Sequence, residues 1–199
     1  MSIKALIWDL EGVLLISDFG SVEQIIQKRL SVSREAIGDF FHSEFNDRVD
    51  RGEFTQEEYW LRLLENLGLP RHNLSIIYEH FYSDLYIDPE LLSRVKEYRK
   101  RFKTALLSNY SDHLRPLLET KWRVDNAFDE IIISWEVKMI KPDPEIFDYT
   151  LLRLGVAKKE AVLIDDREAN IIGARNYGMH AVLFKNKNQA IDELEKLIA

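Results

Sequence analysis

Short apolar runs bounded by polar residues recur along the chain and predict five buried strands. Runs of this kind are typical of parallel sheets that are covered on both faces. The predicted strands are residues 3–8, 104–107, 130–133, 161–164 and 181–184. Between the last four strands, apolar positions follow the helical period instead. This alternation of strands and helices implies a parallel sheet with right-handed crossovers.

The helices between these strands carry recognisable end signals. Proline follows a capping residue at Asp88 and again at Asp143. Ser111 or Asp112 is expected to cap the helix between them, and Gly155 is placed to end the helix that Asp143 opens. These residues predict where the helices that flank the sheet begin and end.

The segment after the first strand differs, because residues 17–86 show helical patterns and no convincing strand. Its helices have three N-terminal signals: Ser21 with Gln24, Ser33, and Thr55 with Glu58. The fold class is therefore predicted as α/β, a Rossmann-like parallel sheet of about five strands flanked by helices. Residues 1–14 and 87–199 are expected to form the core, and residues 15–86 an inserted α-helical cap over the strand ends.

Composition narrows the function without assigning one. The formal net charge is -7, which argues against nucleic acid as the main partner, and no cysteine is present for disulfide or thiol chemistry. Neither a charged leader nor an apolar run of membrane-span length is found, so we expect a cytoplasmic protein that does not associate with membranes. The five histidines have no metal-binding spacing and are expected to serve packing or the surface.

Polar residues gather where the predicted strands end. They are Asp9, Glu11, Ser108, Asn109, Asp165 and Asp166, with Lys141 just before a helix. Parallel strands bring these positions to one edge of the sheet, where open α/β sheets bind ligands. Each pair of like charges 4 Å apart costs ~1 kcal/mol in water and ~4 kcal/mol at an effective dielectric of 20. Four carboxylates therefore need a cation, and oxygen ligands without nearby His or Cys favour Mg²⁺ over zinc.

These residues, taken in order, resemble the four motifs of the haloacid dehalogenase-like hydrolase superfamily. The motifs are Asp9-Leu10-Glu11-Gly12-Val13, Ser108-Asn109, Lys141-Pro142-Asp143 and Asp165-Asp166, and the resemblance spans nearly the whole chain. The stretch from Ile164 to Met179 is most similar to a branch with bacterial sugar-phosphate phosphatases and the phosphatase domain of soluble epoxide hydrolases. The resemblance implies a Mg²⁺-dependent phosphatase acting on a small phosphorylated metabolite, with a sugar phosphate as the natural candidate.

The resemblance also implies a role for each residue. Asp9 would attack phosphorus and form an aspartyl-phosphate, and Glu11 would act as general acid and then as general base. Mg²⁺ would be held by Asp9, the main-chain carbonyl of Glu11 and Asp166, with Asp165 in or beside the coordination shell. Phosphate oxygens would be held by Ser108, Asn109 and Lys141, together with main-chain amides.

Glu11 departs from the superfamily pattern, which usually has aspartate at this position. Its side chain is one methylene longer, and a displacement of about 1 Å can cost ~10²-fold in rate. Enolase-phosphatases resemble this motif with a glutamate, so Glu11 is interpreted as a working acid and base. Asn170 stands where many relatives have aspartate, and this branch often has asparagine there.

Other functions remain open from the residues alone. A phosphomutase would use the same site, and a weakly active or non-catalytic relative would bind phospho-ligands or a protein partner. A dehalogenase is disfavoured because its chemistry needs neither Glu11 nor a metal. A phosphorylated signalling receiver is disfavoured by the position of its acidic pair and by the cap. In the cap, Phe19, Phe45 and Arg48 could contact substrate, but core packing or solvent exposure is the expected role of each. The protein is expected to be a monomer or weak dimer.

Overall fold

The computed structural model describes residues 2–17, 22–41, 44–81 and 85–199. Its strands are β1 (Ala5–Trp8), β2 (Leu15–Ser17), β3 (Leu85–Ile87), β4 (Lys103–Ser108), β5 (Glu130–Ile133), β6 (Ala161–Asp165) and β7 (His180–Leu183). The first five helices are α1 (Val22–Leu30), α2 (Arg34–Phe41), α3 (Glu44–Asp50), α4 (Gln56–Asn66) and α5 (Asn73–Phe81). The others are α6 (Pro89–Arg99), α7 (Leu114–Thr120), α8 (Ser134–Val137), α9 (Pro144–Leu154), α10 (Glu168–Tyr177) and α11 (Lys187–Ile198).

Five strands form one parallel sheet in the order β5-β4-β1-β6-β7. β1 lies in the middle, where Leu6 pairs with Thr104 of β4 on one side and with Val162 of β6 on the other. All five correspond to predicted strands, and their bounds differ from the prediction by a few residues at most. The predicted fold class, a Rossmann-like α/β sheet flanked by helices, is confirmed.

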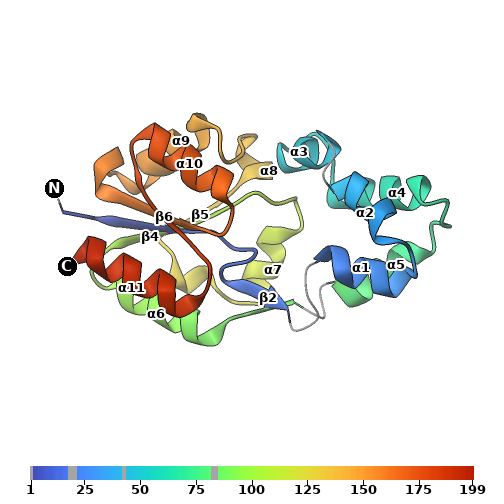
Figure 1. Ribbon diagram of the computed structural model, residues 1–199, viewed down its shortest axis with the longest axis horizontal. Helices are drawn as coiled ribbons and strands as arrows, with labels where there is room; N and C mark the ends of the chain where they lie inside the picture. The colour runs from blue at the N-terminus through green and yellow to red at the C-terminus, as the bar shows by residue number, and fades with distance from the viewer. Residues whose placement is uncertain (1, 18–21, 42–43, 82–84) are drawn as a thin grey trace.

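Helices cover both faces of this sheet, as Figure 1 shows, with α9 and α10 on one face and α6 and α11 on the other. Side chains alternate between the two layers along each strand, as the period of two requires. Ile7 of β1 packs with Phe147 of α9, whereas Trp8, the next residue, packs in the layer of Val95 from α6. Because β1 is fully buried on both faces, the residues that follow it are fixed in position.

The helices α1 to α5 lie between β2 and β3, and we call residues 22–81 the helical insertion. It lies at the end of the sheet remote from the N-terminus, beyond the carboxyl ends of the strands (Figure 1). β2 and β3 pair with each other in antiparallel fashion, with Leu15 opposite Ile87. The prediction of no strand in residues 17–86 was wrong here, because each strand has three residues and its partner is distant in sequence, so no local pattern marks it.

Two of the three predicted helix starts in the insertion lie among the described residues. Thr55 and Glu58 form the predicted capping box at α4, and the amide of Ala36 donates to the Ser33 hydroxyl at α2. Ser21 lies outside the described residues, as does Phe19. Within the described ranges, no helix has the length and apolarity that a membrane span requires.

Two predicted caps of the core have other partners. The helix α7 begins after His113 without a side-chain cap, because Asp112 instead accepts a hydrogen bond from the amide of Gln56 in the insertion. Asp143 has the N-cap position of α9, but its carboxylate pairs with Arg51. The predicted start of α9 at Asp143 and Pro144 is confirmed, but neither side chain makes a capping hydrogen bond, because each one contacts the insertion.

Candidate active site

Lys141 is at the centre of the predicted constellation, with a side chain that is 1% exposed. Its ammonium donates three hydrogen bonds, to Asp9 Oδ1 at 2.7 Å, to Asp165 Oδ2 at 2.7 Å and to the carbonyl oxygen of Leu107 at 2.8 Å. An ammonium has three protons, so each one is engaged. Three strands thus contribute to one buried ion cluster, which holds Asp9 in a defined orientation.

The carboxylate of Asp165 is fixed by hydrogen bonds to both of its oxygens. Both of its carboxylate oxygens accept from the Asn170 side chain at 3.0 Å, and Oδ1 also accepts from the amide of Arg167 at 2.9 Å. With the bond from Lys141, its carboxylate accepts four hydrogen bonds from three donor groups. Asp165 therefore fixes Lys141, and Asn170 in turn fixes Asp165.

Asp166 lies against the turn that follows β1. Gly12 has a φ of 79°, in the left-handed region that favours glycine, and a Cβ added there would overlap the carboxylate of Asp166. Asp166 is exposed, and no hydrogen bond to another side chain is found for it among the described residues. It is thus the member of the acidic pair whose carboxylate is available to a ligand.

Asn109 has a different contact from the one predicted. Its side-chain amide donates to the carbonyl oxygen of Lys141, and its side-chain oxygen accepts from the amide of Lys141, both at 2.8 Å. Ser108, at the end of β4, is 1% exposed. Both residues line the cavity described below, and a phosphate contact by either one stays a prediction.

Burial governs the acid–base behaviour of this cluster. It raises the pKa of Asp9, while the ammonium of Lys141 acts in the opposite direction. For Lys141 burial would lower the pKa, but the charges of Asp9 and Asp165 outweigh it and raise the pKa above its ordinary value. Lys141 is therefore the group that keeps the proton, and Asp9 is held as a carboxylate beside it.

Glu11 points into the same region without joining the ion cluster. Desolvation raises its pKa, although the charge of Arg167 lowers it. Desolvation also raises the pKa of Asp166, and the neighbouring charge of Asp165 adds to the rise. A carboxyl with a raised pKa is suited to hold and release a proton near neutral pH.

A cavity of about 350 Å³ opens at this edge of the sheet. The seven residues predicted for the site are brought together here, and all of them except the enclosed Asp165 line the cavity. The other lining residues are Gly12, Leu15, Ile16, Ser17, Leu85, Arg167 and Asn170. The wall formed by β2 and β3 is therefore largely apolar, and the wall formed by the sheet edge is charged.

The carboxylates could hold a metal ion. Ligand atoms of Asp9, Asp165 and Asp166 all lie within 4.8 Å of one another, the one such group of His, Cys, Asp or Glu found among the described residues. An all-oxygen set suits a hard cation such as Mg²⁺, and the excess of negative charge needs one. The donor set therefore fits the predicted ion.

Two residues near the cavity were not assigned a role from the sequence. Arg167 follows the acidic pair directly, so its place beside the site could have been inferred. Asp50, at the end of α3, is close enough to Glu11, Arg167 and Lys141 for their charges to affect its pKa. No sequence signal indicates Asp50, because its position depends on how the insertion contacts the core.

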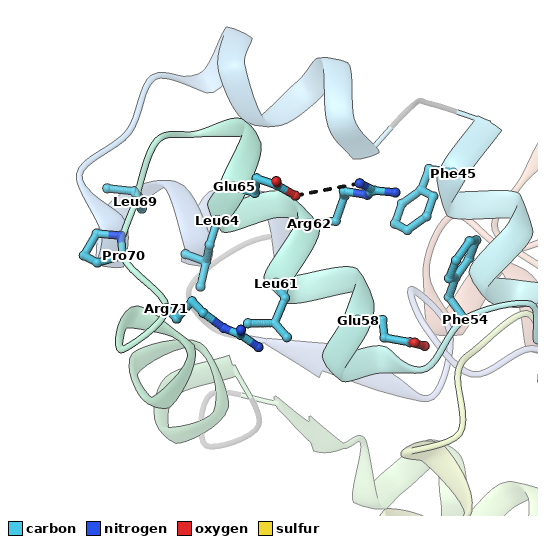
Figure 2. A pocket seen from close by; sticks show the side chains of 10 residues that line it. All are labelled: Phe45, Phe54, Glu58, Leu61, Arg62, Leu64, Glu65, Leu69, Pro70 and Arg71. Carbon is cyan, nitrogen blue, oxygen red and sulfur yellow. Dashed lines mark ion pairs between the residues drawn. The ribbon is translucent and has the colours of Figure 1, made fainter.

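A second and larger cavity lies in the helical insertion, at about 580 Å³ (Figure 2). It extends along α4, and its lining is Phe45, Phe54, Glu58, Leu61, Arg62, Leu64, Glu65, Leu69, Pro70 and Arg71. Arg62 pairs with Glu65 at 3.7 Å, with both side chains more than half exposed. The cavity shares no lining residue with the one at the sheet edge. Phe45, for which packing was the expected role, lines this cavity, and Arg48 pairs with Glu53.

Comparison with known proteins assigns the class. The family model for haloacid dehalogenase-like hydrolases matches residues 3–178, so the chain belongs to this family of hydrolases. The resemblance that the four motifs indicated is thereby confirmed.

The individual relatives share about a quarter of their aligned residues with this chain. Mouse bifunctional epoxide hydrolase 2 is 26% identical over 99% of this chain and 39% of that protein, so the chain spans about two fifths of its length. The sesquiterpene phosphatase astK of Aspergillus oryzae is 24% identical over 98% of this chain and 96% of that protein. A family enzyme from Bacteroides thetaiotaomicron, solved with magnesium and inorganic phosphate, is 26% identical with a TM-score of 0.73. That alignment covers 92% of this chain and 94% of the solved one.

Proposed function

We propose that the protein is a Mg²⁺-dependent phosphomonoester phosphatase that acts through an aspartyl-phosphate on Asp9. The observation that carries the proposal is the carboxylate of Asp9, buried and held at 2.7 Å by Lys141 on the wall of a cavity. A carboxylate fixed in this way is a preorganised nucleophile. We also propose that residues 15–86 act as a cap over the core formed by residues 1–14 and 87–199.

The first half of the reaction transfers the phosphoryl group. A carboxylate oxygen of Asp9 attacks phosphorus as the bond to the ester oxygen breaks, and the electron pair of that bond goes to the oxygen. Glu11, whose pKa burial raises, donates its proton to the departing oxygen. The products are the free alcohol and an acyl phosphate on Asp9.

The second half regenerates the enzyme. Glu11, now ionised, takes a proton from water, and the hydroxide oxygen attacks phosphorus. The bond between phosphorus and the Asp9 oxygen breaks, its electrons return to the carboxylate, and inorganic phosphate leaves. Lys141 lies against Asp9 throughout, so its charge stabilises the carboxylate as leaving group and the phosphoryl oxygens beside it.

Asp9, Asp166 and the main-chain carbonyl of Glu11 would hold the magnesium ion. Asp165 is the weaker candidate as a ligand, because its oxygens already accept four hydrogen bonds. When bound, Mg²⁺ would supply positive charge to the transferring phosphoryl group. The relative from Bacteroides thetaiotaomicron, solved with magnesium and phosphate, supports this assignment.

Ser108 and Asn109 complete the proposed phosphate site, since both line the cavity. We assign the Ser108 hydroxyl to a phosphate oxygen. The Asn109 side chain is occupied with the main chain of Lys141, so we assign its contribution to positioning that residue. The cavity volume of about 350 Å³ is near the low end of the ~300–1,000 Å³ usual for ligand sites. This size favours a small phosphorylated metabolite.

The test measures inorganic phosphate released from a panel of small phosphomonoesters, with Mg²⁺ and with EDTA. Asp9→Asn is the matched control, because it keeps the shape of the side chain and removes the nucleophile. We expect release that requires both Mg²⁺ and Asp9, with Asp9→Asn at least ~10³-fold slower. Transfer of phosphate from one position of the substrate to another without net release would instead indicate a phosphomutase. Release that is unchanged in Asp9→Asn would overturn the proposal.

The role of Glu11 has its own variants. Glu11→Gln should lower turnover by ~10²–10⁴-fold, because the amide cannot donate or take the proton. Glu11→Asp shows whether the longer side chain is the better fit to this site. Activity that appears only in Glu11→Asp would mean that the natural chain binds phospho-ligands without turnover.

A further inference from the structure

Arg167 is a cation on the wall of the active-site cavity that the proposed reaction does not use. It follows Asp166 directly, occupies the N-cap position of α10 and is among the residues that line the cavity. Its main chain is held in place, because its amide donates to Asp165 Oδ1 at 2.9 Å. An exposed guanidinium is therefore carried by a fixed backbone beside the acidic pair.

The guanidinium of Arg167 has no partner within the protein. It makes no hydrogen bond and no ion pair in the described part of the chain. Three other arginines of the core, Arg99, Arg115 and Arg153, each pair with a carboxylate. A guanidinium has five N–H donors, so all five of Arg167 are available to a ligand that enters the cavity.

The other nitrogen donors on the side chains of the cavity wall are already engaged. All three protons of Lys141 are donated within the buried ion cluster. The side-chain amide of Asn109 is bonded to the main chain of Lys141, and that of Asn170 to a carboxylate. Among the described lining residues, Arg167 is thus the cation that is left for a substrate.

The transferring phosphoryl group does not require this cation. It would lie against Asp9, where Lys141 supplies positive charge at 2.7 Å and a bound metal ion would supply more. Arg167 forms no ion pair with Asp9 and is not part of that cluster. It lines the same cavity as Glu11, the proposed proton donor to the leaving oxygen. The cavity that receives the leaving alcohol therefore has an unused cation on its wall.

We propose that Arg167 determines specificity by binding a second anionic group of the substrate, a carboxylate or a second phosphate carried by the leaving alcohol. This assignment rests on the proposed function. The planar guanidinium can donate two parallel hydrogen bonds to either anion. A neutral alcohol would leave these donors to solvent and gain no binding energy from them.

The opposite wall limits what else the substrate can carry. Leu15, Ile16 and Leu85 line the side formed by β2 and β3, which suits carbon atoms better than hydroxyl groups. The volume of about 350 Å³ leaves room for only a short carbon chain between the two anions. Among the two sources of the second anion, this size favours the carboxylate, so the expected substrate is a small phosphorylated hydroxy acid.

The experiment compares kcat/KM for three esters built on the same three-carbon chain. Glycerol 3-phosphate has a neutral end, 3-phosphoglycerate has a carboxylate at that end, and propane-1,3-diol bisphosphate has a second phosphate there. An activated ester without a second anion, p-nitrophenyl phosphate, reports the phosphatase chemistry by itself.

Two variants remove different properties of the side chain. Arg167→Met removes the charge and keeps most of the length, whereas Arg167→Lys keeps the charge and loses the planar fork. Arg94→Met is the matched control, because Arg94 is an exposed arginine of α6 that lines neither cavity.

We expect the natural chain to prefer 3-phosphoglycerate over glycerol 3-phosphate by ~10- to 100-fold, the usual effect of a hydrogen bond to a charged group. Arg167→Met should bring this ratio close to one by losing activity on the acid, and Arg167→Lys should keep part of the preference. Arg94→Met should leave the ratio unchanged, and p-nitrophenyl phosphate should be hydrolysed at similar rates by all four proteins. The larger of the two anion preferences identifies the carboxylate or the phosphate as the second group.

The specificity role fails if neither anionic ester is preferred over glycerol 3-phosphate. It also fails if Arg167→Met slows all esters, p-nitrophenyl phosphate included, by the same factor, because Arg167 would then serve the transferring phosphoryl group. In both cases hydrolysis that depends on Asp9 leaves the proposed function standing. If no ester is hydrolysed in an Asp9-dependent manner, the proposed function fails and the role of Arg167 with it.

Discussion

The cavity at the sheet edge and the cavity along α4 differ in where their charged residues lie. The larger one, at about 580 Å³, runs along α4 and has charged residues only at an exposed rim (Figure 2). The smaller one, at about 350 Å³, is bordered by an ion cluster whose side chains are at most 9% exposed. Solvent screens the charges of the first, whereas burial strengthens those of the second. Buried charge is therefore the better guide to the chemistry than volume.

Replacing the buried cation is the strongest way to test this contrast. Lys141→Met removes the charge and leaves Asp9 and Asp165 unneutralised at the same buried place. Breaking a buried ion pair on one side typically costs ~3–5 kcal/mol, and loss of a charge beside the phosphoryl group costs ~10²–10³-fold in kcat. We expect Lys141→Met to lower both the free energy of unfolding and kcat. Urea unfolding with EDTA present measures the first, and phosphate release measures the second.

Lys138→Met is the matched control for that variant. Its ammonium donates to the carbonyl of Gly52 from an exposed position, so we expect a change below ~1 kcal/mol. The contrast between the cavities would be contradicted if Lys141→Met unfolded at the same urea concentration as the natural chain.

Asp50 provides a second test, since burial raises its pKa to about 7 from an ordinary 3.8. The folded chain then keeps a proton between these pH values that the unfolded chain has lost. Stability from this group is therefore full below about pH 4 and declines as pH rises through 7. The full shift corresponds to ~4 kcal/mol, which partial solvent exposure reduces to ~1–2 kcal/mol.

Asp50→Asn should remove this dependence, because the amide does not ionise. We expect the variant to be more stable than the natural chain by ~1–2 kcal/mol at pH 8 and no more stable at pH 4. Thermal unfolding at the two pH values, with EDTA, makes the comparison, and Asp47→Asn serves as control. A gain of equal size at both pH values would show that burial of the charge is not the cause.

Whether a site residue could be predicted from the sequence depends on which part of the chain contributes its neighbours. Asp9 and Asp165 were predicted together because each is at or just beyond the end of a strand, and the sheet brings such ends to one edge. Lys141 was added as the residue just before a helix. That argument needs only local patterns and one topological rule. It did not decide which of Asp165 and Asp166 is the metal ligand. The hydrogen bonds that Asp165 accepts favour Asp166 as the freer ligand.

Residues between the insertion and the core could not be predicted in this way. Asp112 and Asp143 have the spacing of helix caps, yet their side chains contact Gln56 and Arg51 of the helical insertion instead. A capping pattern shows only what a side chain can do locally, and a partner distant in sequence can compete for it. Asp50 was missed for the same reason, because only the docking of Arg51 and its neighbours brings it near the site.

The smallest predicted effect concerns the larger cavity. Arg62→Met removes a cation from its rim, where the pair with Glu65 is 3.7 Å long and the guanidinium lies 5.6 Å from the centre of the Phe45 ring. Exposed pairs of this kind contribute at most ~0.5 kcal/mol, so we expect stability to change by less than that. Phosphate release should stay within ~2-fold, as the residue contacts nothing in the smaller cavity.

This variant can nevertheless break the contrast between the two cavities. Phe45 stacks on Tyr59 at 5.9 Å between ring centres, and the charges of Asp50 and Glu11 act on Tyr59. Tyr59 therefore packs against a lining residue of the larger cavity and lies within range of the charges near the smaller one. If Arg62→Met lowered phosphate release by ~10-fold, the rim of the larger cavity would act on the chemistry of the smaller one. Unchanged phosphate release would leave the larger cavity as a packing feature of the insertion, and the buried ion cluster as the feature that defines the site.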